Sequence, residues 1–143
     1  MTVRVILSVK GRDVATIRPE APIADAVKLL SEKKIGAVVI SGPDQGVAGI
    51  LSERDIVRAL SKHGSGALTH TVGSVMTRKV VTCTAEETIS ALMQRMTTGR
   101  FRHVPVVEHG RLVGIVSVGD VVKHRLEELE HESQALREYI ATA

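Results

Sequence analysis

The chain has 143 residues, so it has room for one ordinary domain or for two small ones that share a core. Hydrophobic residues make up 43% of the chain, which indicates a packed interior rather than disorder. Aromatic side chains are nearly absent, with only Phe101 and Tyr139, and the net charge is only +3. These properties argue against stacking platforms for single-stranded nucleic acid and against a strongly basic face for duplex binding.

The start of the chain and its single cysteine lead us to expect a cytoplasmic protein without membrane contact. Arg4 interrupts the apolar run in MTVRVILSVKG, no small-residue cleavage site follows it, and no stretch is long enough to cross a bilayer. Cys83 has no partner for an internal disulfide, which suits a reducing compartment. Because Cys83 lies in an apolar strand pattern, we interpret it as a buried small hydrophobe.

In chain order, a predicted helix near Val3–Lys10 is followed by two copies of one unit. The segment from Val14 aligns with the segment from Val80, and both copies carry Gly-Ile-x-Ser-x-x-Asp, at residues 49–55 and 114–120. In each copy the pattern predicts a strand, a helix, a two-stranded hairpin and a second helix. The fold class expected is therefore α/β, with two β-α-β-β-α repeats related by a pseudo-twofold axis.

The expected boundaries follow from the same alignment. The strands are expected at Val14–Ile17, Ala37–Ser41 and Val47–Leu51 in the first copy, and at Val80–Cys83, His103–Val107 and Leu112–Val116 in the second. The predicted domains are residues 1–62 for the first repeat with the N-terminal helix, 63–71 for a linker, 72–125 for the second repeat and 126–143 for a helical extension. Helices cover one face of each sheet, so we expect the repeats to pack sheet to sheet with ligand clefts at the junction.

The serine and aspartate of the duplicated motif suggest two compatible roles. Ser52 and Ser117 stand where a strand ends and a helix begins, so Ser-x-x-Asp is similar to a helix capping box. Capping alone does not require the preceding Gly-Ile, nor does it favour Asp. We therefore also expect Asp55 and Asp120 to face clefts, where a carboxylate can accept both hydroxyls of a ribose and the serine can donate to a phosphate.

Cations for such a phosphate precede the hairpin of the second copy. Arg100, Arg102 and His103 come directly before an apolar strand, and these side chain types bind phosphate. The alternative is a solvated pair of arginines beside a strand. Pro105 removes one bond from the strand ladder, which could free a backbone group to contact an adenine.

The first copy lacks this cluster, since Gly36 and Ala37 stand at the positions of Arg102 and His103. The cations near these positions in the first copy are Lys33, Lys34 and Arg54. We therefore expect the two sites to be inequivalent.

In order and in duplicate, these segments resemble a tandem pair of CBS domains, the cystathionine-β-synthase-type repeat also called a Bateman module. The resemblance covers residues from about 3 to 125 and depends on G-I-x-S-x-x-D, RHVPVV, DVATIRPEAPI, KVVTCTAEETI and VGSVMT. It is strongest to stand-alone bacterial CBS-pair proteins. It implies a regulatory sensor of energy or redox state that binds AMP, ADP, ATP, NAD(H) or S-adenosylmethionine reversibly, with AMP or NADH preferred and no covalent cofactor.

Carried over by position, the resemblance implies two sets of nucleotide-binding residues. One site would take Thr16, Ile17, Ala37, Val38, Ser52 and Asp55, with Arg54 as an added cation. The other would take Thr82, Cys83, His103, Val104, Pro105, Ser117 and Asp120. The resemblance also implies that phosphates point towards the central axis, so Arg100, Arg102 and His103 would serve the sister site.

Beyond the second repeat, the predicted helix carries apolar residues at alternating spacings of three and four. The stripe consists of Val122, Leu126, Leu129, Leu136 and Ile140, with Ser133 at the missing position. We expect a homodimer contact here, of unknown orientation, and packing of the helix onto its own domain is the alternative. His124 and His131 share a face but have no third ligand, so no metal site is predicted.

Two other function classes compete with a ligand sensor. An enzyme is not expected, because neither copy offers a nucleophile with a base, paired carboxylates or a Walker loop. The alternative function is a protein- or nucleic-acid-binding adaptor with vestigial nucleotide sites, which would use Arg95, Arg100 and Arg102. For the sensor itself we expect no nucleic-acid partner, and the identity of a regulated protein is left open.

Overall fold

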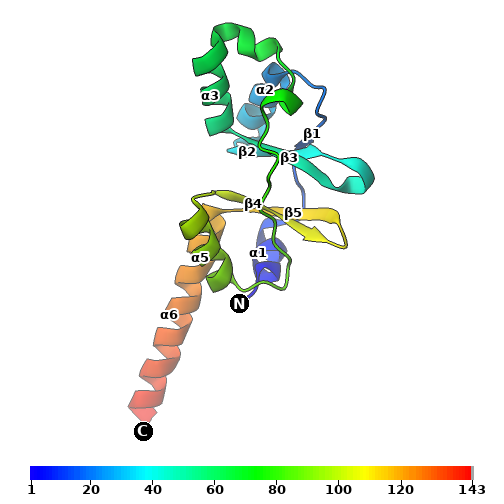
Figure 1. The fold of residues 1–143 in the computed structure, drawn as a ribbon. Coiled ribbons are helices and arrows are strands. Elements are labelled where there is room, and N and C mark those ends of the chain that lie inside the picture. The colour runs from blue at the N-terminus through cyan, green and yellow to red at the C-terminus, as the bar shows by residue number, and fades with distance from the viewer. Residues whose placement is uncertain (143) are drawn as a thin grey trace.

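The structure, a computed structural model, describes residues 1–142. Two β-sheets face each other at the middle of an elongated molecule, and helices cover their outer sides (Figure 1). One sheet has the strand order β1-β2-β3 and the other contains β4 and β5. The repeats therefore pack sheet to sheet, as predicted.

The elements follow the predicted order. They are α1 (Val3–Lys10), β1 (Thr16–Ile17), α2 (Ile23–Lys33), β2 (Ala37–Ser41), η1 (Pro43–Gln45), β3 (Val47–Ser52), α3 (Glu53–His63), η2 (Gly64–Thr69), α4 (Val72–Val75), α5 (Ile89–Gly99), β4 (His103–Glu108), β5 (Arg111–Ser117) and α6 (Val118–Thr142). The helix at Val3–Lys10 and both hairpins are confirmed. The predicted linker contains η2, in which Ala67 is fully buried in the core of the first repeat.

The prediction of a three-stranded sheet in the second repeat is wrong. Of the expected strand Val80–Cys83, only Cys83 pairs, through a single parallel bridge to Val106. Two other backbone groups there have different partners: the N–H of Val80 donates to the carbonyl of Arg78 at 3.0 Å, and the Arg95 guanidinium donates to the carbonyl of Thr82 at 3.0 Å. In the first repeat the equivalent strand is short, at Thr16–Ile17, and runs parallel to β2.

The segments that lead into the two repeats are exchanged. Helix α1 precedes the first repeat in sequence, yet Val3, Ile6 and Leu7 are buried in the apolar core of the second repeat (Figure 1). Helix α4 precedes the second repeat, yet Val72 is buried in the core of the first. Each hydrophobic core is therefore completed by residues from the segment that leads into the other repeat.

This exchange explains the glycine of the duplicated motif. A Cβ at Gly49 would lie 2.5 Å from the sulfur of Met76 and 2.9 Å from the carbonyl oxygen of Thr77. A Cβ at Gly114 would lie 2.5 Å from a methyl carbon of Leu7. At Gly49 the near atoms include backbone, so glycine is needed for this close approach, whereas at Gly114 the near atoms belong to the flexible side chain of Leu7.

Helix α6 extends well beyond the second repeat (Figure 1). Its first part packs through Val121 and His124, which are buried, while residues 131–142 are all exposed. Ala143, the last residue of the predicted extension, lies outside the described residues. Among the residues that are described, no helix has both the length and the apolar character that crossing a membrane requires.

Candidate functional site

Two cavities lie where the repeats meet, and each combines the motif of one repeat with the start of the hairpin of the other. The first cavity has a volume of about 570 Å³, and its polar lining includes Ser52, Arg54, Asp55, Arg58, Thr77, Arg100, Arg102 and His103. The second has a volume of about 750 Å³, and its lining includes Lys10, Lys33, Lys34, Gly36, Ala37, His103, Ile115 and Ser117. Ser52 and Ser117 are equivalent in the two repeats, as are Lys34 and Arg100, so the cavities are pseudo-symmetric.

In the first cavity the start of α3 holds Asp55 in place. Ser52 caps this helix by accepting from the N–H of Asp55 at 3.3 Å, and one Asp55 oxygen accepts from the N–H of Ser52 at 2.9 Å, which forms the predicted capping box. The hydroxyl of Thr77 donates to the other Asp55 oxygen at 3.2 Å. Asp55 is only 8% exposed, so a rigid carboxylate with spare acceptor capacity forms part of the cavity wall.

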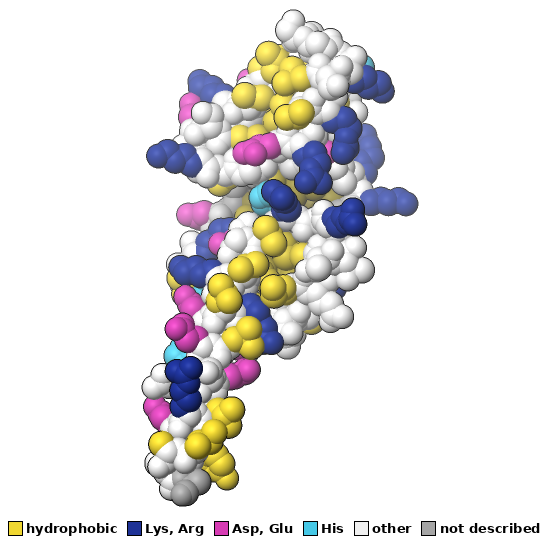
Figure 2. Space-filling view, turned by 90° about the vertical axis from the view of Figure 1, so that its left-hand side faces the viewer, with side chains coloured by type: hydrophobic (Ala, Val, Ile, Leu, Met, Phe, Trp, Pro, Cys, Tyr) yellow, Lys and Arg dark blue, Asp and Glu magenta, His cyan; other side chains and the backbone are white. Residues whose placement is uncertain are grey.

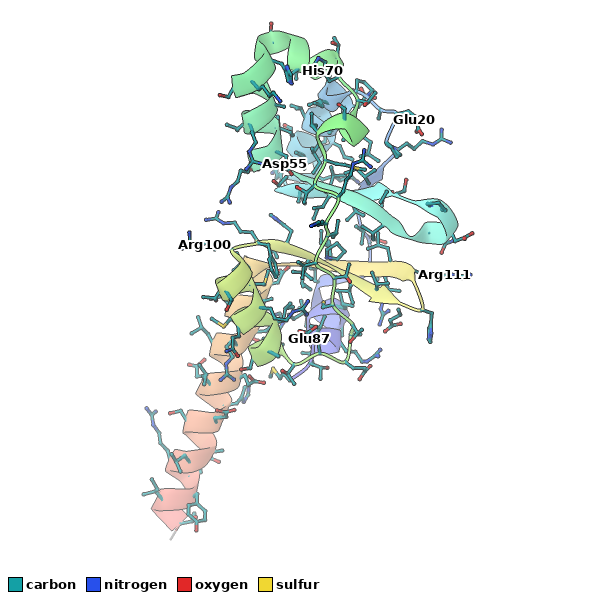
Figure 3. All side chains as sticks on the ribbon, in the orientation of Figure 1. Glu20, Asp55, His70, Glu87, Arg100 and Arg111 are labelled. Atoms are coloured by element: carbon teal, nitrogen blue, oxygen red, sulfur yellow. The ribbon has the colours of Figure 1, made fainter. Side chains whose placement is uncertain are left out.

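Arginines surround the same cavity. Arg100 and Arg102 come from the second repeat, whereas Arg54 and Arg58 come from α3 of the first. Figure 3 shows Asp55 in the upper half of the molecule and Arg100 in the lower half, with the gap between the repeats separating them. In the space-filling view, Lys and Arg side chains also gather around the middle of the molecule, where the two repeats meet (Figure 2). The second repeat therefore presents two arginines to the cavity, and α3 adds two more together with the carboxylate of Glu53.

Arg100 adopts an unusual backbone conformation. It ends α5 with φ of 57°, and its counterpart Lys34 ends α2 with φ of 55°, both in the left-handed region. Glycine is the usual residue at such a helix end, because other residues lose about 1 kcal/mol or more there. Each of these residues lines a cavity. A basic side chain thus stands at the rim of each cavity despite unfavourable backbone geometry.

The second cavity differs because a lysine is bonded directly to its aspartate. The Lys10 ammonium lies 2.7 Å from an oxygen of Asp120, and the same oxygen accepts from the N–H of Ser117 at 2.8 Å. Burial acts to raise the pKa of Asp120, but the hydrogen bonds from Lys10 and Ser117 and the Lys10 charge outweigh it, so the pKa lies below its ordinary value. Lys10 lines the cavity and Asp120 does not.

His103 lies between the two cavities and contributes to the lining of both. A Cβ at Gly36 would lie 3.1 Å from the Nε2 atom of His103, so the absence of a side chain at Gly36 makes room for the imidazole. Burial, with a smaller contribution from the Lys10 charge, lowers the pKa of His103 below its ordinary value. The imidazole is therefore neutral at neutral pH and can both donate and accept.

The structure does not place all the predicted site residues at the cavities. Those that line one are Ala37, Ser52, Arg54, Asp55, Arg100, Arg102, His103 and Ser117. Those that line neither are Thr16, Ile17, Val38, Thr82, Cys83, Val104, Pro105 and Asp120. Ser52 and Asp55 share a cavity with Arg100 and Arg102 of the sister repeat, whereas Ala37 lines the other cavity.

Burial and backbone pairing explain several of these placements. Val38 and Val104 are fully buried in the two cores. Burial, followed by the nearby charge of Glu87, raises the pKa of the Cys83 thiol to about 12, which makes it an unreactive thiol. The carbonyl of Pro105 accepts from the N–H of Cys83 at 3.1 Å, so that group is already paired.

Sequence reasoning missed Lys10 and Thr77 as site residues. Both belong to the segments that lead into the repeats, and each contacts the aspartate of the other repeat. Extending the alignment of the repeats backwards places Lys10 opposite Met76 and Gly11 opposite Thr77, so internal similarity gave no signal for either residue. As for metals, His124 is buried and its Nδ1 lies 2.9 Å from the carbonyl oxygen of Asp120; within residues 1–142, no three His, Cys, Asp or Glu side chains gather as metal ligands would.

Comparisons with known proteins agree with this architecture. The CBS domain profile matches residues 8–62 and 72–127. The structure of a CBS-domain-containing protein of Agrobacterium tumefaciens is 49% identical in sequence, with a TM-score of 0.84 over 87% of this chain and 99% of that chain. The CBS domain pair of protein MJ0100, in complex with 5′-methylthioadenosine and S-adenosylmethionine, is 26% identical, with a TM-score of 0.79 over 90% of this chain and 98% of that chain.

A curated relative is the mitochondrial CBS domain-containing protein CBSX3 of Arabidopsis thaliana, 38% identical over 122 residues. The match covers 82% of this chain but only 59% of the length of CBSX3. Both halves of this chain therefore match the same domain, and the whole arrangement matches solved tandem pairs. The chain belongs to the CBS-domain family and carries two CBS domains in tandem.

Proposed function

We propose that this protein is a regulatory module that binds an adenosine nucleotide of the AMP, ADP, ATP or NAD(H) type in the first cavity. The proposal depends on one observation: a buried carboxylate, Asp55, and the arginines Arg100 and Arg102 line the same cavity from different repeats. A carboxylate accepts hydrogen bonds from a ribose diol, and guanidinium groups bind phosphate. The bound adenosine compounds of the MJ0100 pair support the choice of ligand class.

The remaining lining fits the other parts of a nucleotide. Ile50, Val57 and Phe101 provide apolar surface for a base. Ser52, whose hydroxyl donates to Asp55 at 3.1 Å, lies at the N-terminus of α3, where an anion is stabilised. Because both repeats supply walls of the cavity, a ligand that binds one relative arrangement of the repeats more tightly shifts the population towards it. That shift is the signal in this proposal, and a regulated protein reads it.

Ligand binding is best measured by calorimetry and thermal melting with AMP, ADP, ATP, NAD⁺, NADH and 5′-methylthioadenosine. At a ligand concentration one hundred times the Kd, the free energy of unfolding should rise by about 2.7 kcal/mol. The 2′-deoxy analogue of the best ligand should bind more weakly, because Asp55 then loses one hydrogen-bond donor. Failure of every adenosine compound to bind or to raise the melting temperature would refute the proposal.

A pair of variants tests the phosphate contact. Arg100→Gly relieves the left-handed backbone strain, so the fold should be at least as stable while phosphate-bearing ligands bind more weakly. Binding of 5′-methylthioadenosine, which has no phosphate, should change little. Lys34→Gly makes the same backbone change at the second cavity and serves as the matched control. Equal losses in both variants, or a loss for every ligand alike, would contradict the assignment of the phosphate to Arg100.

A further inference from the structure

The distal half of α6 carries apolar side chains that the rest of the protein does not cover. Leu126, Leu129, Leu136 and Ile140 are 62%, 43%, 59% and 66% exposed. With Ser133 they recur at alternating spacings of three and four residues, the seam of a coiled coil. Figure 2 shows hydrophobic side chains gathered on one side of the projecting helix near its end. A helix end of this length without packing is marginal in water, so a partner is expected along this seam.

We propose that the occupant of this seam is a second copy of the chain, in a parallel, in-register two-stranded coiled coil. In that arrangement each seam residue meets its own copy, and the flanking charges meet across the seam. Arg125, which precedes Leu126, faces Glu130 of the second copy. Glu132, which precedes Ser133, faces Arg137 of the second copy. Both contacts join opposite charges, and the twofold axis repeats each of them.

Other registers of the parallel pair bring like charges together. Because the two chains are identical, a slip of one heptad gives the same arrangement in either direction. It places Arg125 of one chain opposite Arg137, Arg125 of the other chain opposite Lys123, and Glu132 opposite Glu130. The slip also sets Ser133 against an apolar residue. The charge pattern therefore selects the in-register pair over its neighbours.

Antiparallel pairing is disfavoured by the same pattern. The antiparallel register that overlaps the whole seam places Glu130 opposite Glu130 and Glu132 opposite Glu132. It also places Lys123 opposite Arg137. Antiparallel registers shifted by a heptad restore opposite charges, but they pair fewer of the apolar seam residues with one another. Among these registers, the parallel, in-register pair covers the complete seam, joins opposite charges at two flanking contacts and brings no like charges together.

The contacts within one chain are compatible with this pairing. Arg125 donates to Glu128 on the same helix, and the N-terminal ammonium of Met1 also lies 2.6 Å from Glu128. Glu128 therefore keeps a cation when Arg125 turns towards the second copy. The residues of the other contact, Glu132 and Arg137, are both exposed. The dimer thus forms without breaking the packing of α6 against its own repeat.

Charge reversal tests the partner and the orientation together. Sedimentation velocity should show a dimer for the wild type, and Glu132→Arg or Arg137→Glu should each weaken it by about tenfold or more, because two repulsive contacts replace two attractive ones. Mixing the two variants should restore a heterodimer, since each supplies the charge that the other lacks. Residues 132 and 137 are not neighbours on one helix, so the rescue cannot arise within a chain. His131→Arg, on the outer face, is the matched control and should leave the dimer intact.

Cross-linking gives an independent readout of the register. In the proposed dimer a cysteine at Ser133→Cys meets its own copy and should oxidise readily to an intermolecular disulfide, whereas His131→Cys should not. The native Cys83 is 4% exposed and does not interfere. A monomeric wild type, a dimer indifferent to both charge reversals, failure of the mixed variants to pair or equal cross-linking at positions 131 and 133 would each overturn the proposal. Adenosine-nucleotide binding by Glu132→Arg is measured in parallel, so this proposal and the proposed function can fail separately.

Discussion

The two cavities are built from equivalent segments, yet their aspartates are held differently. Asp55 lines the first cavity, its hydrogen bonds come from Ser52 and Thr77, and the Arg58 guanidinium lies 3.8 Å from its carboxylate. Lys10 lines the second cavity and is bonded directly to Asp120 at 2.7 Å, and Asp120 itself is not part of the lining. The backbone arrangement of the site is thus duplicated. The residues of the segment that leads into one repeat decide whether the aspartate of the other repeat can accept hydrogen bonds from a ligand.

The largest effect is expected from Asp55→Asn. The amide keeps one oxygen for the helix cap but loses the charged acceptor for the ribose, and a hydrogen bond to a charged group contributes about 1.5–3 kcal/mol. Ligand affinity should therefore fall by about tenfold to one hundredfold. Asp120→Asn should change the affinity far less. Calorimetry on both variants checks the comparison, and a larger loss in Asp120→Asn would reverse our ranking of the cavities.

A second comparison concerns the glycines of the duplicated motif. Gly49→Ala brings a Cβ within 2.9 Å of the carbonyl oxygen of Thr77, so the backbone must move, whereas Gly114→Ala meets only the flexible end of Leu7. We expect Gly49→Ala to lower the free energy of unfolding by about 1–3 kcal/mol and Gly114→Ala to lower it less. Urea unfolding of the two variants measures the difference. Equal losses would mean that the exchanged segments adapt equally well.

Removal of the lysine should make the two cavities more alike. Lys10→Met leaves Asp120 without its ion pair, so the second cavity should gain affinity for ribose-containing ligands, and the calorimetric stoichiometry should rise towards two per chain. Lys33→Met also changes a cation of the second cavity but does not contact Asp120, so it serves as the control. An unchanged stoichiometry in Lys10→Met would show that Lys10 does not restrict the site.

The smallest effect is the pH dependence of the same ion pair. The pKa of Asp120 in the folded protein lies below its ordinary value of 3.8, so its contribution to stability is present above that value and is lost as the pH falls through the lower folded pKa. The pair is partly exposed, so we expect at most about 1 kcal/mol from it. The stability difference between the wild type and Lys10→Met should therefore shrink below about pH 4. A difference that persists into stronger acid would assign the effect to packing instead.

The sequence predicted the parts of the fold that depend on local pattern. The duplicated motif, the hairpins and the serine caps follow from apolar periodicity and from residues that favour turns and helix starts, and the structure confirms them. The motif also identified Ser52 and Asp55, which the first cavity brings together with Arg100 and Arg102. These predictions needed only neighbours in sequence or equivalent positions in the two copies.

The features that were not predicted depend on which repeat each leading segment packs against. Similarity between the two repeats carries no information about these contacts. The apolar residues of α1 and α4 could cover either repeat as judged from their sequence, so the roles of Lys10 and Thr77 were not predictable. The strand expected at Val80–Cys83 failed because alternation does not reveal competition from Arg78 and Arg95 for its backbone groups. Strand pairing and the packing of distant segments depend on tertiary contacts rather than on the secondary-structure propensity of the residues.

The exchange of leading segments also interlocks the two halves of the chain. Cleavage within residues 63–71 would give an amino-terminal fragment that retains α1 but lacks Val72 to complete its own core. The carboxy-terminal fragment would lack Val3, Ile6 and Leu7. Neither duplicate could therefore be lost or transferred alone without exposing apolar surface, which would preserve the pair as one inherited unit.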